Sequence, residues 1–553
     1  MNRRRFLRNS SLAALGALTM KVGSHPSLAV PAPGAESKRA RLDVIWGDRV
    51  GKINRNIYGH FTEHLGSCIY DAMWVGEGSA IPNQNGLRKD TIEALKRIRA
   101  PIIRWPGGCF ADQYHWRDGV GPREKRPRIW NIWWGRDEGN AFGTDEFIQY
   151  CWLSGAAPYI CFNVGSGSPQ EALDWLEYCN GKESTTVTSL RADNGHPEPY
   201  NVRYWSVGNE NWGCGGNFDA ESYAREYARY MTYLNRYAER GTVEFVACGD
   251  FREDWNQKFF ETLLKRPGAR GQLRGVNHLS VHHYFHGGPA VEFSDDDYYR
   301  VLASVSVLEG YIEETLGLIQ HYTTPQDRIG IALDEWGIWH PVPATGAQGL
   351  WQSNTLRDAL LAAVVFNSLN SYGDAVSMAN IAQTFNVLQC IAFTKGDKFA
   401  LTPTYHVFDL YQPHMDAMAL KTVVDSPTCT LKPLTQLPPQ FLAQLGGRGE
   451  TTRTYLSASA SLNEAKKQIC LTLVNQHLTE PLEVLIQIPG LDSPGVRGGT
   501  LRELTSGNAR DENTLEKPEV IRPLEPKQLT VQGNKFTQLV PPHTVQALVL
   551  QAG

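Results

Sequence analysis

Two stretches, RYWSVGNE at residues 203–210 and IGIALDE at residues 329–335, decide the fold class of this 553-residue chain. Each contains a short, mostly apolar run that ends in polar residues, which is typical of a buried parallel strand. Between residues 51 and 415 the same character recurs in six further segments, at 56–60, 102–106, 159–164, 243–248, 278–282 and 376–381. This region therefore has eight candidate strands.

Helical patterns separate these strands. The clearest covers residues 219–240, where large side chains recur at spacings of three and four on one face, at Tyr223, Tyr227, Tyr230, Leu234 and Tyr237. Residues 352–372 and 403–411 also have helical character. Alternating strands and helices over about 360 residues predict an α/β fold, the (β/α)8 or TIM barrel.

An open doubly wound sheet is the rival architecture. Such sheets usually bind a nucleotide through a G-x-G-x-x-G turn. The nearest approach, GSGSPQ at residues 165–170, lacks the third glycine, and the sequence has no Walker A motif. The barrel is therefore favoured.

The remaining residues divide into three parts. Residues 1–29 read as a signal peptide, and residues 30–50 as a Pro/Ala/Gly linker that leads into a strand at 41–46. After the barrel at 51–415, residues 416–553 have strand patterns at 468–474, 482–488 and 545–550 without long helical periodicity. They predict an all-β sandwich, jelly-roll-like, to which the strand at 41–46 adds.

The N-terminus predicts export. NRRRFLR at residues 2–8 resembles the twin-arginine consensus, 11–20 is weakly apolar and too short for a membrane span, and SLA at 27–29 offers a cleavage site. We therefore expect a periplasmic or secreted protein with no membrane association after cleavage. The net charge is −4, and −9 without residues 1–29, so nucleic acid is not an expected partner.

The cysteine content predicts mostly buried thiols. Ten cysteines in 553 residues are too few for a disulfide-built scaffold, and no CxxC pair occurs. Twin-arginine export carries folded proteins, so folding before export would allow these thiols to stay reduced. A zinc ribbon is not expected.

Polar residues at the strand ends indicate the chemistry, because catalytic groups of such barrels lie at the C-terminal ends of the strands. The fourth strand leads to Asn209 and Glu210, and the seventh to Asp334 and Glu335. Two carboxylates that face each other across the barrel mouth suit glycoside hydrolysis, in which one protonates the leaving oxygen and the other attacks or activates water. Other strand ends offer Glu63, Arg104, Cys109, His282, His283, Tyr284 and Gln383.

Several motifs in order resemble the family 51 glycoside hydrolases, the α-L-arabinofuranosidases. They are IYGHFTEHLG at 57–66, RWPGGC at 104–109, VGNE at 207–210, LDEWG at 333–337, Ala382-Gln383 and the closing PPHTV at 541–545. The resemblance covers about residues 42–553. It implies a (β/α)8 barrel with a β-sandwich and the retaining, exo-acting removal of terminal α-L-arabinofuranosyl groups from arabinan, arabinoxylan or arabino-oligosaccharides.

The resemblance also implies roles for single residues. Glu210 matches the general acid/base, Glu335 the nucleophile, and Tyr284 the tyrosine that orients the nucleophile. Asn209 is expected to bind the sugar 2-OH. The other expected substrate-binding residues are Glu63, Cys109, Trp134, His282 and Gln383. Cys109 stands where many members carry Asn, which would weaken one sugar hydrogen bond.

Four alternatives remain open at this level. HFTEH at residues 60–64 fits the H-x-x-E-H pattern of zinc peptidases, although that motif needs a helix and this segment follows a predicted strand. An endo-β-glucanase or a β-xylosidase would use the same two carboxylates, and a non-catalytic carbohydrate-binding protein would need neither. We expect no metal and no cofactor, an arabinose-containing glycan as the partner, and possible self-association, since family members are often oligomers.

Overall fold

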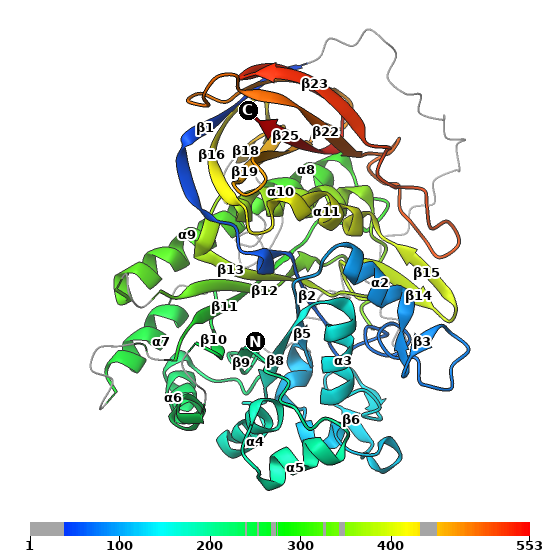
Figure 1. Ribbon diagram of the computed structural model, residues 1–553, viewed down its shortest axis with the longest axis vertical. Coiled ribbons are helices and arrows are strands. Elements are labelled where there is room, and N and C mark those ends of the chain that lie inside the picture. The colour runs from blue at the N-terminus through cyan, green and yellow to red at the C-terminus, as the bar shows by residue number, and fades with distance from the viewer. Residues whose placement is uncertain are drawn as a thin grey trace, which may run out of the picture.

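The computed structural model describes residues 38–553, apart from 238–240, 252–253, 267–272, 274, 325–327, 342–348 and 432–450. The predicted signal peptide and the start of the linker lie outside these residues. Figure 1 shows a barrel surrounded by helices, with a β domain packed on one side of it. Among the described residues, no helix combines the length and the apolar character that crossing a membrane requires.

Eight parallel strands close the barrel, which confirms the predicted (β/α)8 fold. Around the barrel they are β2 (Gly59–Phe61), β5 (Ile102–Trp105), β8 (Ala157–Phe162), β9 (Tyr204–Val207), β10 (Glu244–Cys248), β11 (His278–Phe285), β12 (Gly330–Ile338) and β13 (Val376–Ala382). β13 pairs with β2 to complete the ring. The strands are buried on both faces, which explains their nearly continuous apolar sequence.

The helices of this domain pack outside the strands. They are α2 (Lys89–Arg97), α3 (Thr144–Ser154), α4 (Pro169–Asn180), α5 (Thr186–Asp193), α6 (Ala220–Tyr237), α7 (Trp255–Leu264), α8 (Asp295–Ala303), α9 (Val305–Tyr322), α10 (Leu356–Asn370) and α11 (Pro403–Tyr411). The predicted tyrosine face of α6 is the buried one, with Tyr223, Tyr227 and Tyr230 at most 1% exposed. The spacing of large side chains therefore predicted correctly which face of α6 packs against the barrel.

The first strand begins later than the sequence pattern predicts. Residues Arg55–Tyr58 form a short 3-10 helix, and only Gly59–Phe61 pair as β2. The side chain of Asn54 accepts a hydrogen bond from the backbone of Asn56, which caps that turn. The apolar residues of 56–58 are buried all the same, so burial was predicted correctly and the local conformation was not.

The second domain is a nine-stranded sheet that encloses its own apolar core. Its strands are β1 (Lys38–Lys52), β16 (Met418–Asp425), β19 (Leu456–Asn463), β20 (Gln468–Asn475), β21 (Leu482–Gln487), β22 (Val496–Leu504), β23 (Lys527–Gly533), β24 (Lys535–Val540) and β25 (Thr544–Ala552). β1 lies between β16 and β21, so the start of the described chain is built into the C-terminal domain. The predicted α/β barrel with a β-sandwich is therefore the observed architecture.

Besides the barrel and the nine-stranded sheet, the described residues form four two-stranded ribbons. They are β3 (Asn83–Gln84) with β4 (Leu87–Arg88), β6 (Ile129–Asn131) with β7 (Arg136–Glu138), β14 (Ala392–Lys395) with β15 (Lys398–Leu401), and β17 (Thr428–Leu431) with β18 (Thr451–Thr454). The β6–β7 ribbon reaches the mouth of the barrel, because the segment between its strands carries Trp134.

Helix α10 joins the two domains. All fifteen of its residues are buried, because the barrel covers one side of the helix and the sheet covers the other (Figure 1). Its polar residues bond to the sheet: Asn367 donates to Ser457 and accepts from Thr472, and Asn370 donates to Ser459. These buried hydrogen bonds tie the barrel to the sandwich.

Candidate active site

The strand-end residues converge on one narrow cleft at the barrel mouth. Seven residues singled out from the sequence line it, namely Glu63, Cys109, Trp134, Glu210, Tyr284, Glu335 and Gln383. The rest of its lining is Leu65, Gly108, Trp339, Leu350 and Leu388. Polar groups from six strand ends and one loop therefore face a single small space with apolar walls, which is the usual form of a ligand site.

An irregularity in β12 places two consecutive acidic side chains on the inside of the barrel. Against β11, Ser280 pairs with Ala332 and His282 with Glu335, so β12 has one residue more than its neighbour over this span. The pairing with β13 is also irregular, between Leu333 and Trp336. Such a bulge redirects a side chain that simple alternation would point outwards. Ala332 packs inside the barrel, so alternation turns Asp334 inwards as well, and the bulge brings Glu335 to the same side above it.

Two donors hold the carboxylate of Glu335. Arg104, on β5, donates from Nη1 to Oε1 at 2.8 Å, and the hydroxyl of Tyr284 donates to Oε2 at 2.7 Å. The other arm of Arg104 donates to Oδ1 of Asn209 at 2.6 Å. Arg104 thus joins the ends of the fourth and seventh strands. The amide NH2 of Asn209 faces the sulfur of Cys214 at 3.9 Å, and Asn209, which was predicted to bind the sugar, is not among the residues that line the cleft.

Glu210 stands on a strained turn. Its φ is 41°, in the left-handed region that costs a non-glycine residue about 1–3 kcal/mol. Asp112 supports the turn from below, because its Oδ2 accepts the backbone N–H of Asn209 at 3.0 Å and its Oδ1 accepts those of Val164 and Gly165. Burial raises the pKa of Asp112 to about 7, against the lowering effect of these three N–H groups.

The two glutamates lie close together. One carboxylate oxygen of Glu210, one of Glu335 and one ring nitrogen of His282 all lie within 4.8 Å of one another. Nδ1 of His282 is 3.2 Å from Oε1 of Glu210 and 3.6 Å from Oε2 of Glu335. Retaining glycosidases hold their two carboxyl groups about 5–5.5 Å apart, and inverting ones about 6.5–9.5 Å apart. The closeness of the two carboxylates agrees with the spacing of retaining enzymes.

The carboxylate of Glu63 accepts hydrogen bonds from three residues. The backbone N–H of Phe110 and the indole N–H of Trp134 both donate to Oε1 at 3.0 Å, and Gln383 donates to Oε2 at 3.1 Å. Gly107 allows this close packing, since a Cβ there would lie 2.4 Å from the Glu63 side chain. Three residues predicted to bind the sugar are thereby fixed relative to one another.

Cys109 is not a thiol. Its sulfur is bonded to that of Cys214, which lies four residues after Glu210. The sulfur of Cys214 is 3.4 Å from Oε2 of Glu210, but it carries no proton to donate. The pairing was not predicted, and it joins the loop after β5 to the loop after β9. Seven of the eight other cysteines are buried thiols, as expected.

The two neighbouring histidines of β11 point to opposite sides, as the alternation of a strand predicts. His282 lies beneath the two glutamates and is not part of the cleft lining. His283 packs outside the barrel among Phe251, Phe285 and Tyr311, where burial lowers its pKa to about 3. The two rings are therefore unable to share one ion.

The H-x-x-E-H segment does not have the geometry of a zinc site. The ring of His60 is buried and stacked on Phe408, 4.9 Å between centroids. His64 bonds through Nδ1 to Glu138 at 2.8 Å, and its Nε2 accepts the indole N–H of Trp105. The segment leaves a strand rather than forming a helix. The two histidines therefore have separate structural partners.

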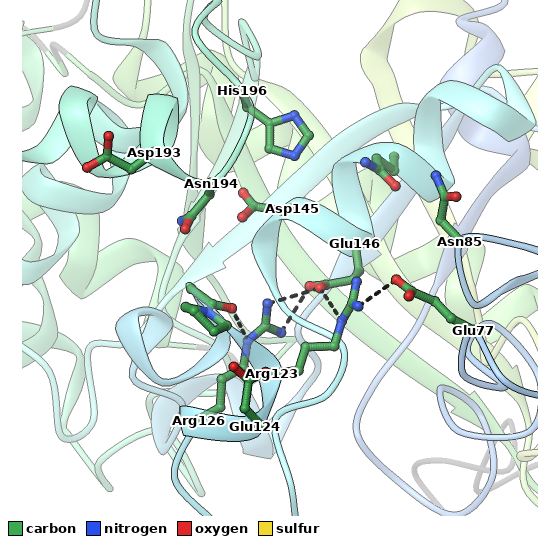
Figure 2. Close-up of a pocket in the computed structure, with 13 residues that line it drawn as sticks. Glu77, Asn85, Arg123, Glu124, Arg126, Asp145, Glu146, Asp193, Asn194 and His196 are labelled. Carbon is green, nitrogen blue, oxygen red and sulfur yellow. Dashed lines mark hydrogen bonds and ion pairs between the residues drawn. The ribbon is translucent and has the colours of Figure 1, made fainter.

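A roomier cleft of about 450 Å³ lies on the flank of the barrel and shares no lining residue with the mouth. Figure 2 shows Arg123 and Arg126 converging on Glu146, with Arg123 also bonded to Glu77. Asp145 accepts hydrogen bonds from two buried tyrosines, Tyr178 and Tyr200. The two arginines thus neutralise Glu146 and Glu77, and Asp145 is held by neutral hydroxyls.

Four functional positions were not assigned from the sequence: Arg104, Asp112, Cys214 and Asp334. Arg104 and Asp334 stood at predicted strand ends, which was a usable signal. Asp112 and Cys214 lie in loops, where a single sequence gives little indication of what a side chain will meet.

Comparison with known proteins agrees with this geometry. Residues 94–299 match the family described as "Alpha-L-arabinofuranosidase 1 domain", and residues 334–544 match "Alpha-L-arabinofuranosidase C-terminal domain". An intracellular exo-α-L-arabinofuranosidase of Bacteroides ovatus is 37% identical over 507 residues, which cover 90% of this chain and 93% of the relative.

Solved structures give the same result. A family 51 arabinofuranosidase from Xanthomonas axonopodis pv. citri is 33% identical, with a TM-score of 0.83 over 93% of this chain and 100% of the other. An α-L-arabinofuranosidase from Thermotoga maritima, solved as an arabinose complex, is 34% identical, with a TM-score of 0.80 over 92% and 99%. With its barrel, its β domain and its strand-end glutamates in place, the chain belongs to the α-L-arabinofuranosidases of glycoside hydrolase family 51.

Proposed function

We propose that this protein is a retaining, exo-acting α-L-arabinofuranosidase. It removes terminal, non-reducing α-L-arabinofuranosyl residues from arabinan, arabinoxylan or arabino-oligosaccharides. The observation that carries the proposal is the pair Glu210 and Glu335, with oxygens within 4.8 Å of each other in one cleft. The narrow cleft, closed by Trp134, Trp339 and Leu388, suits one terminal sugar better than the middle of a chain, which an endo-β-glucanase would bind.

In the first step, Glu335 attacks the anomeric carbon. Its oxygen forms a bond to that carbon while the glycosidic C–O bond breaks, and the leaving oxygen takes the proton of Glu210. Arg104 and Tyr284 each hold one oxygen of Glu335, so the carboxylate keeps a fixed orientation for the attack. The products are the leaving alcohol and an arabinosyl ester on Glu335.

In the second step, Glu210 acts as a base. It takes a proton from water, the water oxygen attacks the anomeric carbon, and Glu335 leaves as a carboxylate. Two inversions at the same carbon give net retention. Glu63 and Gln383 present polar groups to the furanose hydroxyls, and Asn209 lies next to Glu210 behind the cleft lining. Trp134 contributes an aromatic wall and Cys109 a disulfide wall instead of a thiol.

We also propose that residues 1–29 direct export through the twin-arginine route to the periplasm or beyond. The support is the sequence alone, because this segment lies outside the described residues. The relative from Bacteroides ovatus is named as intracellular, so location within the family has to be determined for each chain.

Export is tested by fractionation. Arabinofuranosidase activity of the full chain should appear in the periplasm or medium, and replacing Arg3 and Arg4 by Lys should leave it in the cytoplasm. The matched control is Arg8→Lys, which alters the same region outside the arginine pair. Cytoplasmic activity of the unmodified chain would contradict the proposal.

Retention is tested on a chromogenic aryl α-L-arabinofuranoside followed by proton NMR. The first sugar formed should have the α configuration, before mutarotation produces the β anomer, because the close pair of glutamates supports a double displacement. A β product formed first would mean direct displacement by water. Lack of turnover, with turnover of an aryl β-xyloside or β-glucoside instead, would favour the other glycosidases.

The two glutamates should respond differently to removal. Glu335→Ala should lower the rate on every substrate by several orders of magnitude, because the nucleophile is lost. Glu210→Ala should keep far more first-step rate on a nitrophenyl arabinofuranoside, whose leaving group needs no proton, than on an arabino-oligosaccharide. Azide should rescue Glu210→Ala with retention and Glu335→Ala, if at all, with inversion.

The opposite pattern would show that the roles are exchanged. Full activity of both variants would place the active site elsewhere. Glu124→Ala is a suitable control, because Glu124 lies in the flank cleft of Figure 2 and should have little effect on either substrate.

A further inference from the structure

Asp334 is a buried carboxylate that the proposed reaction does not use. Its side chain is inaccessible to solvent, and both of its oxygens are engaged. Oδ1 accepts from the hydroxyl of Ser280 and faces Nε2 of His282 at 3.1 Å. Oδ2 accepts from Tyr159 at 2.8 Å and lies 3.5 Å from Nε of Arg104. A buried charge of this kind needs such partners to be stable.

His282 connects this carboxylate to the catalytic pair. One ring nitrogen faces Asp334, and the other faces Glu210 at 3.2 Å and Glu335 at 3.6 Å. Both nitrogens therefore face carboxylate oxygens, which only accept hydrogen bonds when they are ionised. A neutral ring has one proton and satisfies one side only, whereas the imidazolium donates to both.

The charges of the cluster are consistent with a protonated ring. When Glu210 carries its proton, Arg104 and His282 contribute two positive charges, and Asp334 and Glu335 contribute two negative ones. The other side chains bonded to Asp334 and Glu335 are the hydroxyls of Ser280, Tyr159 and Tyr284, which are uncharged. Glu63 has partners of its own in Phe110, Trp134 and Gln383. Together, Arg104, His282, Asp334, Glu335 and protonated Glu210 then carry no net charge at the start of the reaction.

We infer that Asp334 is a positioning residue that keeps His282 doubly protonated, so that one imidazolium serves both Glu210 and Glu335. The inference rests on the proposed roles of these two glutamates. The bulge in β12 makes it possible, since it places Glu335 on the same inner side as Asp334 and so leaves Asp334 directly beneath the nucleophile.

The pKa values agree with this geometry. Burial alone would lower the pKa of His282, but Glu335, Asp334 and Glu210 outweigh it and raise the pKa to about 10. Burial would raise the pKa of Asp334, but Arg104 and His282 hold it well below its usual range. The imidazolium should therefore persist across the working pH range.

The His282 imidazolium has a role in the proposed reaction. Glu210 becomes a carboxylate as it gives its proton to the leaving oxygen, and the imidazolium stabilises that new charge at a distance of 3.2 Å. Without Asp334, the ring loses the partner that holds its second proton. Glu210 would then face a neutral ring at neutral pH.

The first test uses Asp334→Asn, which keeps the size of the side chain and removes its charge. We expect kcat/KM on an arabino-oligosaccharide to fall at least tenfold more at pH 8 than at pH 5, because His282 loses its proton within this interval. Ser280→Ala is the matched control: it removes a neutral hydrogen bond to the same carboxylate, and its effect should not change with pH. Equal, pH-independent losses in both variants would overturn the inference.

The second test is read on the unmodified chain, and a variant serves only to assign the signal. In the unmodified chain labelled with 13Cε1-histidine, the His282 signal, assigned by its absence in His282→Gln, should remain that of an imidazolium up to pH 8. Titration near or below pH 7 would overturn the inference. Because this readout is independent of activity, it is separable from the proposed function, which fails if Glu335→Ala and Glu210→Ala stay active.

Discussion

The buried charge cluster beneath the barrel mouth is the constraint on which the rest of the site depends. Arg104 and His282 lie among Asp334, Glu335 and Glu210, at distances between 2.8 and 3.6 Å. Removing one member would leave an uncompensated charge in the interior, which typically costs about 3–5 kcal/mol. The cluster therefore fixes the ends of β5, β9, β11 and β12 relative to each other, and with them the two glutamates.

The fold supplies this cluster with rigid surroundings. Parallel strands bring residues 104, 210, 282 and 335 together from distant parts of the sequence, and the bulge in β12 keeps both Asp334 and Glu335 on the inner side. Asp112 and the Cys109–Cys214 disulfide hold the strained turn at Glu210 from two sides. On the outer side, α10 bonds to the β domain, so the sandwich supports the helix that follows the seventh strand.

The sequence was sufficient for the barrel, the sandwich and the lining of the cleft, because strand ends of a (β/α)8 barrel meet at one face whatever their distance in sequence. Glu63, Glu210, Tyr284, Glu335 and Gln383 all follow that rule. That Asp334 and Glu335 both point inwards was not predictable, since a bulge adds a residue without a sequence signature. Nor was the Cys109–Cys214 bond, because a sequence with ten cysteines does not specify which of them pairs with a partner 105 residues away. The 3-10 turn at 55–58 shows that an apolar run predicts burial more reliably than it predicts secondary structure.

The assignment of Glu335 as the nucleophile can be measured directly as a covalent bond. Glu210→Ala, incubated with a nitrophenyl arabinofuranoside, lacks the base for the second step and should accumulate the arabinosyl ester. Intact-mass spectrometry should then show one added pentosyl group, and peptide mapping should place it on Glu335. An adduct on another residue, or a variant that turns over without any adduct, would contradict the double displacement through Glu335.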